Sequence, residues 1–100
     1  GENIGCGEVE AALLEHPLVQ EASVYAVPDQ RLGEEVGTTL YVSSSVTESE
    51  LSGFLQERLA KFKIPRYIHQ QQTPLPRTAS GKILKRDLRE EACQRLGLAQ

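Results

Sequence analysis

The chain has 100 residues, enough for one compact domain, which excludes a separate linker or a second catalytic lobe. Its 39% hydrophobic and 25% charged residues are typical of a folded domain, so extended disorder is excluded as well. No apolar run approaches the roughly 20 residues that cross a membrane, and Gly1-Glu2-Asn3 does not resemble the basic start of a signal peptide. Cys6 and Cys93 lie far apart without a CxxC motif or paired histidines, so we expect reduced thiols and no metal site. Together these features predict a soluble, cytoplasmic domain.

The net charge of −3 conceals an uneven distribution. Residues 1–50 carry one base and ten acids, whereas residues 51–100 carry ten bases and four acids. Nine of these bases occur between Arg58 and Arg89, and such a surface attracts phosphate-bearing partners, although a solvated face explains the charges equally well. Nucleic acid is not an expected partner, because the five aromatic residues are not interleaved with the basic ones.

The first half of the chain predicts a helix followed by two strands. Apolar residues at helical spacing over residues 7–16 indicate a short amphipathic helix, which Pro17 ends. Apolar side chains on both faces over residues 19–27 indicate a buried strand, and Pro28-Asp29 is expected to break it. Residues 36–42 are rich in β-branched and aromatic side chains, which indicates a second strand.

The second half predicts two helices separated by a short strand. Thr47-Glu48-Ser49-Glu50 matches a capping box, in which the Thr47 hydroxyl and the Glu50 carboxylate each accept the other residue's backbone N–H. The helix that follows is expected to run to about Ala60, with Val46 and Leu51 as a hydrophobic staple around its start. A third strand is expected over residues 67–71 and a loop from residue 75 through 81. A last helix over about 84–96, stopped by Gly97, has four residues on its expected buried face: Leu84, Leu88, Ala92 and Leu96.

This order of elements predicts an α+β fold, a small mixed or antiparallel sheet of about three strands covered by about three helices. The Gln70-Gln71-Gln72 run is expected at the surface.

The segment from Pro76 to Lys82, PRTASGK, is the one most typical of a functional site. Small or hydroxylated residues and Gly81 precede Lys82, so the backbone can approach a ligand while the ammonium reaches an oxyanion. The segment is not a P-loop, because GxxxxGK[ST] requires glycine at position 76 and Ser or Thr at position 83. Taken alone, Lys82 is better explained as an ordinary surface lysine.

Residues 75–88, LPRTASGKILKRDL, resemble the C-terminal signature of the AMP-forming acyl-CoA synthetase family, which includes acyl-CoA ligases, luciferases and peptide-synthetase adenylation domains. Further segments resemble the same family in the same order: GENI with EVE at 8–10, VPD with GEEV, and KFKIPR at 61–66. The resemblance covers essentially all 100 residues. It implies that residues 1–100 are the mobile C-terminal lid of an acid–CoA ligase whose large N-terminal adenylating domain is absent from this chain.

The resemblance implies a reaction in two steps. A carboxylic acid, such as a fatty acid, reacts with Mg²⁺-ATP to give an acyl-adenylate and pyrophosphate, with ATP and Mg²⁺ bound mainly by the absent domain. Lys82 matches the family's catalytic lysine of this step, and its charge is expected to stabilise charge that builds in the transition state, with Ser80 and Gly81 beside the phosphates. The segment also resembles the PxxxxGK pattern of relatives that protein acetyltransferases modify. Acetylation of Lys82 is therefore expected to stop adenylation but spare thioester formation.

In the second step the lid rotates and the thiol of CoA attacks the adenylate. Gly1 and Asn3 match the family segment that lines the pantetheine tunnel, although a plain turn before the helix also explains them. Glu8 and Glu10 are interpreted as helix-start and surface acids rather than as an acid/base pair. Three basic residues are candidates for the CoA phosphates, with solvation of a helix end as the stronger alternative: Lys61, Lys63 and Arg66.

The chain also departs from the family pattern. Cys6-Gly7 stands where the family often has a proline, which predicts a looser path into the first helix. The nucleotide loop, the acid pocket and the hinge residue belong to the preceding domain, so the chain alone is not expected to catalyse either step. The sequence from Ser80 to Arg86, SGKILKR, and the lack of a following carrier domain favour CoA as the acceptor of the acyl group. The alternatives are a lid of a carrier-protein-loading enzyme, a non-catalytic interaction or dimerisation module, and a free nucleotide- or CoA-binding domain.

Overall fold

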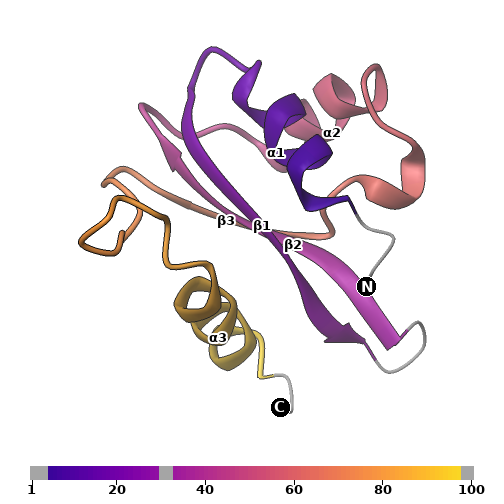
Figure 1. The fold of residues 1–100 in the computed structure, drawn as a ribbon. Coiled ribbons are helices and arrows are strands. Elements are labelled where there is room, and N and C mark those ends of the chain that lie inside the picture. Colours follow the sequence, from indigo (N-terminus) through magenta and orange to yellow (C-terminus); the bar gives the residue numbers. More distant parts are fainter. Residues whose placement is uncertain (1–4, 30–32, 98–100) are drawn as a thin grey trace.

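The computed structural model describes residues 5–29 and 33–97, which fold into a three-stranded sheet with helices on both sides (Figure 1). In chain order the elements are α1 (Cys6–Leu14), β1 (Val19–Asp29), β2 (Gly33–Val42), α2 (Glu48–Gln56), the 3₁₀ helix η1 (Lys61–Lys63), β3 (Tyr67–Gln71) and α3 (Lys85–Arg95). The α+β prediction is confirmed, as is the order of its elements.

The sheet is mixed, with the strand order β1-β2-β3. Strands β1 and β2 form an antiparallel hairpin in which Val24 pairs with Thr38, and β2 pairs in parallel with β3. A parallel neighbour requires a crossover connection, and α2 with η1 supplies it between β2 and β3.

Each face of the sheet has its own hydrophobic core. Helices α1 and α2 cover one face, where Leu13, Val24 and Leu55 are fully buried (Figure 1). Helix α3 covers the other face, where Leu88 packs with Tyr25 and other residues of β1. The alternating apolar residues of β1 therefore point into two cores, which confirms the prediction of a strand buried on both sides.

The hairpin strands extend beyond their predicted ends. Strand β1 continues through Pro28 to Asp29, which pairs with Gly33 at the start of β2, so the prediction of a break at Pro28 was wrong. Pro28 is tolerated because β1 is an edge strand, where a missing backbone N–H need not leave a neighbouring strand unpaired.

Helix α2 begins as predicted and ends earlier. The Thr47 hydroxyl accepts the backbone N–H of Glu50 at 3.0 Å, and the helix ends at Gln56 rather than near Ala60. The carbonyl of Leu55 accepts the amides of both Arg58 and Leu59, which tightens the chain out of the α-helical path. The guanidinium of Arg58 meanwhile occupies the carbonyl of Phe54 at 2.8 Å.

The remaining two helices also differ in detail from expectation. Helix α1 begins at Cys6, after Gly5 at φ +68°, so Cys6-Gly7 is helical and does not loosen the path. In α3 the expected burial of Leu96 is wrong: it is the C-cap residue and is 39% exposed, while Cys93 is fully buried in its place. Gly97 follows with φ +70° and ends the helix as predicted.

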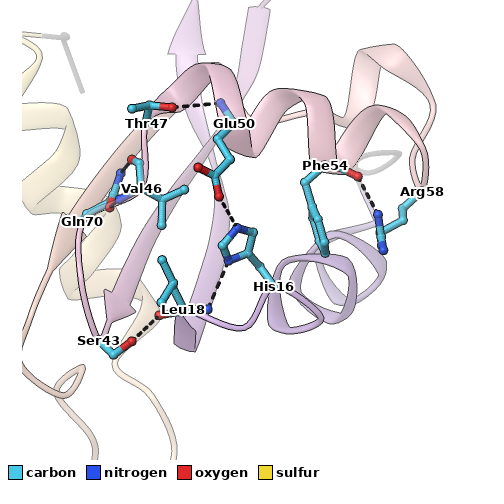
Figure 2. Close-up of polar contacts among 9 residues, drawn as sticks. All are labelled: His16, Leu18, Ser43, Val46, Thr47, Glu50, Phe54, Arg58 and Gln70. Carbon is cyan, nitrogen blue, oxygen red and sulfur yellow. Dashed lines mark hydrogen bonds and ion pairs between the residues drawn. The ribbon is translucent and has the colours of Figure 1, made fainter.

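A buried histidine, His16, joins the turn after α1 to α2 (Figure 2). His16 Nδ1 accepts the backbone N–H of Leu18 at 3.1 Å, so the ring proton lies on Nε2, which donates to Glu50 Oε2 at 3.0 Å. The ring also lies edge-on to Phe54, with centroids 5.0 Å apart. The Glu50 carboxylate thus binds His16, and the reciprocal half of the predicted capping box is replaced by a contact with the turn that follows α1.

We expect His16→Ala to lower the free energy of unfolding by about 2 kcal/mol, because it removes two hydrogen bonds and leaves a cavity beside Phe54. Urea unfolding followed by circular dichroism measures this loss. Glu50→Gln is the matched control, since an amide oxygen still accepts the Nε2 proton. A loss as large in Glu50→Gln as in His16→Ala would show that the contact depends on the charge of Glu50 rather than on an oxygen acceptor for Nε2.

Gln70 has a structural role that its place in a polar run conceals. Its side-chain oxygen accepts the N–H of Val46 at 2.9 Å, and its side-chain nitrogen donates to the carbonyl of Val46 at 2.5 Å (Figure 2). The amide thus pairs with the peptide chain as a neighbouring strand would. The expectation of a plain surface residue was wrong for Gln70, which holds the entry to α2 against β3.

Candidate functional site

Lys82 lies on a tight hairpin formed by residues 77–83, between β3 and α3. An isolated antiparallel bridge joins Arg77 to Ile83, and the N–H of Thr78 donates to the carbonyl of Lys82 at 2.7 Å. Gly81 closes the turn at φ +94°, a conformation that favours glycine, and donates its N–H to the Thr78 carbonyl at 2.9 Å. The stems are held by Leu75, which is buried beneath α3, and by the half-buried Ile83.

Hydrogen bonds fix the backbone at Lys82. Its N–H donates to the Thr78 hydroxyl at 3.1 Å, and that hydroxyl also lies 3.0 Å from the Ser80 hydroxyl. The carbonyl of Gly81, on the other side of the same peptide bond, accepts from the Arg77 guanidinium at 2.6 Å. Both polar atoms of the peptide that precedes Lys82 are therefore bound.

The Lys82 side chain is exposed, and among residues 5–29 and 33–97 its ammonium has no ion-pair or hydrogen-bond partner. A free charge on a fixed backbone can meet an anion presented from outside the domain. The sequence-predicted residues Ser80, Gly81 and Lys82 are thus brought together, whereas Arg77 was not predicted as part of the site.

Arg77 connects the hairpin to the sheet. Its guanidinium forms an ion pair with Glu21 on β1, whose other carboxylate oxygen accepts the N–H of Leu75 at 2.8 Å. Burial raises the pKa of Glu21, but the hydrogen bonds from Arg77 and Leu75 and the charge of Arg77 outweigh it, so the pKa is lowered overall. Glu21 therefore stays ionised at neutral pH. The only sequence signal for this pair was opposite charge, which does not specify a partner.

Acids from the first half of the chain neutralise much of the basic second half. Glu15 pairs with Arg58 at 2.9 Å, and Glu10 pairs with Lys85 at 2.8 Å while also accepting the N–H of Val24 at 2.9 Å. The positive charge available to a phosphate-bearing partner is thus smaller than the composition of the second half predicts. Four cations between residues 58 and 89 have no carboxylate within ion-pair distance in the described part of the chain and no backbone carbonyl partner: Lys61, Arg66, Lys82 and Arg86.

The three basic candidates around η1 have different surroundings. Lys63 Nζ lies 2.5 Å from Glu8 Oε1, which ties η1 to α1. Lys61 is exposed, and Arg66 lies over the ring of Tyr67, 5.6 Å from its centroid, with the Tyr67 hydroxyl 3.4 Å from its Nε. Lys61 and Arg66 thus keep charges that a ligand can use, whereas the charge of Lys63 is engaged.

The start of the described chain lies beside this basic group. A Cβ atom added at Gly5 would lie 3.8 Å from Lys63 Nζ, so Gly5 lies next to the Lys63 side chain. Gly1 and Asn3 themselves lie outside the described residues. Figure 1 shows η1 and the beginning of α1 at one end of the domain and the 77–83 hairpin at the other.

A hollow of about 210 Å³ lies between β3 and α3. Arg66, Tyr67 and His69 line it from the β3 side and Arg95 from α3. Burial and the charge of Arg95 lower the pKa of His69, against a smaller opposing effect of Glu91, so His69 is neutral at pH 7. Lys82 does not line this hollow, and its side chain is exposed on the 77–83 hairpin.

No group of three or more His, Cys, Asp or Glu side chains within residues 5–29 and 33–97 could hold a metal ion. None of the helices in the same ranges has the length and apolar character needed to span a bilayer.

Known proteins resemble the chain in sequence. The model of the AMP-binding enzyme C-terminal domain matches residues 8–82. The 2-succinylbenzoate–CoA ligase of Bacillus velezensis is 47% identical over 90 residues, covering 90% of this chain and 18% of the ligase. The mitochondrial medium-chain acyl-CoA ligase ACSF2 of Mus musculus is 44% identical over 100 residues, covering 98% of this chain and 16% of that enzyme.

Solved structures show the same fold. o-Succinylbenzoate CoA synthetase from Bacillus subtilis, in complex with the acyl-adenylate OSB-AMP, superposes with a TM-score of 0.78 at 40% identity over 83% of this chain and 17% of that one. A double mutant of that enzyme, bound to its product analogue OSB-NCoA, gives a TM-score of 0.80 at 38% identity over 85% of this chain and 17% of that one. The chain thus spans less than a fifth of the length of these relatives.

Proposed function

The chain belongs to the family of AMP-binding enzyme C-terminal domains, and from that premise we propose that it is the mobile lid of an adenylate-forming acid–CoA ligase. The observation that carries the proposal is the hairpin of residues 77–83, whose bound backbone presents an exposed lysine ammonium that does not line the hollow between β3 and α3. Such a group acts on a substrate held elsewhere, which is what a lid over an adenylating domain requires.

In the first half-reaction, Lys82 contributes a positive charge to a site in which the substrate carboxylate attacks the α-phosphate of ATP and pyrophosphate leaves. Negative charge builds on the oxygens around phosphorus in the transition state, and a positioned ammonium stabilises it without reorganising solvent. Ser80 and Gly81 keep the turn compact beside those phosphates. We assign the binding of ATP, and of the Mg²⁺ that accompanies it, mainly to the upstream domain.

In the second half-reaction, the other end of the lid receives CoA, whose thiol attacks the acyl carbon and releases AMP. Lys61 and Arg66 bind the nucleotide phosphates in this proposal, because neither forms an ion pair within 4 Å with a carboxylate of the described chain. Lys63 serves as a tie to Glu8 instead. Gly1 and Asn3 keep their proposed place along the pantetheine tunnel.

The experiment for this function compares CoA with pantetheine, which has the same thiol but no nucleotide phosphates. In the ligase formed by the upstream domain and this chain, we expect Lys61→Ala/Arg66→Ala to raise the KM for CoA about tenfold, as the loss of charge-assisted contacts at an exposed site predicts. The KM for pantetheine and the rate of ATP–pyrophosphate exchange are expected to stay unchanged.

Arg58→Ala is the matched control, because it removes a cation of the same half that pairs with Glu15. An unchanged KM for CoA in the double variant would contradict the phosphate assignment. Efficient transfer to a carrier protein, with CoA no better than pantetheine in the unmodified enzyme, would favour the carrier-loading alternative.

The acid that is activated is a property of the upstream domain in this proposal. A 2-succinylbenzoate ligase and a medium-chain acyl-CoA ligase both resemble this chain, which supports a carboxylic acid as the substrate class without selecting one acid. The cytoplasmic location expected from the sequence stays a prediction, because one relative is a mitochondrial enzyme.

Acetylation of Lys82 by a protein acetyltransferase is part of the same proposal, since an exposed lysine on a hairpin tip is accessible and the modification removes its charge. We expect acetylated enzyme to lose ATP–pyrophosphate exchange while thioester formation from preformed acyl-adenylate continues. Intact-mass measurement beside both rate assays tests this. Full exchange activity in enzyme acetylated at Lys82 would contradict it.

A further inference from the structure

The hairpin that presents Lys82 is too small to be held by a hydrophobic core of its own. Its tip residues, from Thr78 to Lys82, are exposed. Apart from the Arg77 and Thr78 contacts, the orientation of the peptide before Lys82 depends on the turn itself. The position of the ammonium therefore depends on what restrains that peptide.

Arg77 supplies the restraint from the rigid part of the domain. One nitrogen of its guanidinium donates to the Gly81 carbonyl at 2.6 Å, and the other binds the carboxylate of Glu21. The planar guanidinium with several donors in fixed directions can serve two acceptors at once, which a lysine in its place does less well. The peptide of Gly81 and Lys82 is thereby connected through one side chain to β1.

Glu21 is itself well fixed. It lies at a bulge, where the pairing register between β1 and β2 shifts between Val19 and Glu21. Its side chain is 19% exposed and its second oxygen accepts the N–H of Leu75, the buried residue at the entry to the hairpin. The carboxylate thus holds both the stem of the hairpin, through Leu75, and its tip, through Arg77.

From these contacts we propose that Arg77 and Glu21 are positioning residues for the adenylation step, which hold the Lys82 peptide in place without touching substrate. The inference rests on the proposed function of Lys82. A displacement of about 1 Å in a reacting group can cost on the order of 100-fold in rate, so loosening this peptide is expected to affect the first half-reaction strongly. The second half-reaction, which uses the other end of the lid, does not depend on it.

The test uses the complete ligase, with the upstream domain joined to this chain, and the variants Arg77→Ala, Glu21→Gln and their combination. We expect Arg77→Ala to slow acid-dependent ATP–pyrophosphate exchange about 10- to 100-fold and Glu21→Gln about 10-fold. The double variant is expected to be no slower than Arg77→Ala, because Glu21→Gln keeps a side-chain oxygen for the Leu75 N–H and so affects the hairpin tip only through Arg77. Thioester formation from preformed acyl-adenylate is expected to stay unchanged in all three.

Hydrogen exchange supplies a readout apart from the reaction rate. The amide of Lys82 is bound by the Thr78 hydroxyl, so the peptide covering residues 77–84 is expected to exchange faster in Arg77→Ala than in the unmodified enzyme. Arg58→Ala is the control, because it breaks an ion pair with Glu15 that lies away from the hairpin. It is expected to change neither the hydrogen exchange of residues 77–84 nor the rate of either half-reaction.

Lys82→Ala, measured in parallel, separates the two claims. If Lys82→Ala abolishes ATP–pyrophosphate exchange while Arg77→Ala and Glu21→Gln retain it, the positioning role is wrong and the proposed function stands. If the Arg77 and Glu21 variants slow both half-reactions equally, the pair only stabilises the domain and the positioning role is again wrong. If Lys82→Ala itself leaves ATP–pyrophosphate exchange intact, the proposed function fails, and with it the step that Arg77 and Glu21 would serve.

Discussion

Replacing Lys82 by alanine is expected to slow acid-dependent ATP–pyrophosphate exchange by about 100- to 1000-fold, as the loss of a preorganised charge at a developing oxyanion predicts. Thioester formation from preformed acyl-adenylate is expected to continue. In the proposed mechanism, the ammonium stabilises negative charge that builds on the α-phosphate oxygens only in the transition state of adenylate formation. Isotope exchange into ATP and single-turnover formation of the thioester measure the two steps.

The matched control is Arg86→Ala, which removes an exposed cation near the hairpin that likewise has no carboxylate partner among the described residues. It is expected to leave both rates near those of the unmodified enzyme. Lys82→Arg keeps a charge but changes its shape and reach, so it is expected to retain only part of the exchange rate. Equal loss in Arg86→Ala and Lys82→Ala would indicate a general charge effect and contradict a specific role for Lys82.

The second large effect concerns Gly37, in the middle of β2. A Cβ atom at this position would lie 2.9 Å from Cε1 of Tyr25 and 3.3 Å from Cγ1 of Val27. The Tyr25 ring is buried and its hydroxyl lies 2.7 Å from the Thr39 hydroxyl, so the ring cannot shift without losing that hydrogen bond. We expect Gly37→Ala to lower the free energy of unfolding by about 3 kcal/mol, from overpacking together with the weakened hydrogen bond.

Gly53, within α2, provides the opposite case. A Cβ atom there meets nothing within 4 Å, so Gly53→Ala is expected to stabilise the domain by about 0.5–1 kcal/mol through helix propensity. Urea unfolding of both variants against the unmodified chain measures the two effects. A stable Gly37→Ala variant would show that Tyr25 and Val27 can move apart at little cost.

Local signals in the sequence predicted the elements well because the interactions behind them lie within a few residues. The cap at Thr47 and the stop at Gly97 are examples, since each depends on one side chain or one backbone angle. The end of α2 could not be predicted in the same way. It depends on the Arg58 side chain, which takes the Phe54 carbonyl and also pairs with Glu15 of another element.

The candidate site, too, could be predicted only in part from the sequence. The motif around Lys82 was visible in the sequence, because its turn chemistry and its lysine are contiguous. Arg77 lies inside that motif, but its partner Glu21 is 56 residues away, so only the fold could show what the arginine does. Lys63 was grouped with Lys61 by proximity in sequence, and only the packing of η1 on α1 showed that its charge is engaged by Glu8.

The central claim is that opposite ends of one lid serve two successive half-reactions. The most direct test measures both half-reactions in the same preparations of Lys82→Ala and Lys61→Ala/Arg66→Ala. We expect opposite effects in the two variants. Lys82→Ala loses ATP–pyrophosphate exchange and keeps thioester formation, whereas Lys61→Ala/Arg66→Ala keeps ATP–pyrophosphate exchange and loses affinity for CoA. Parallel losses of both activities in both variants would contradict it.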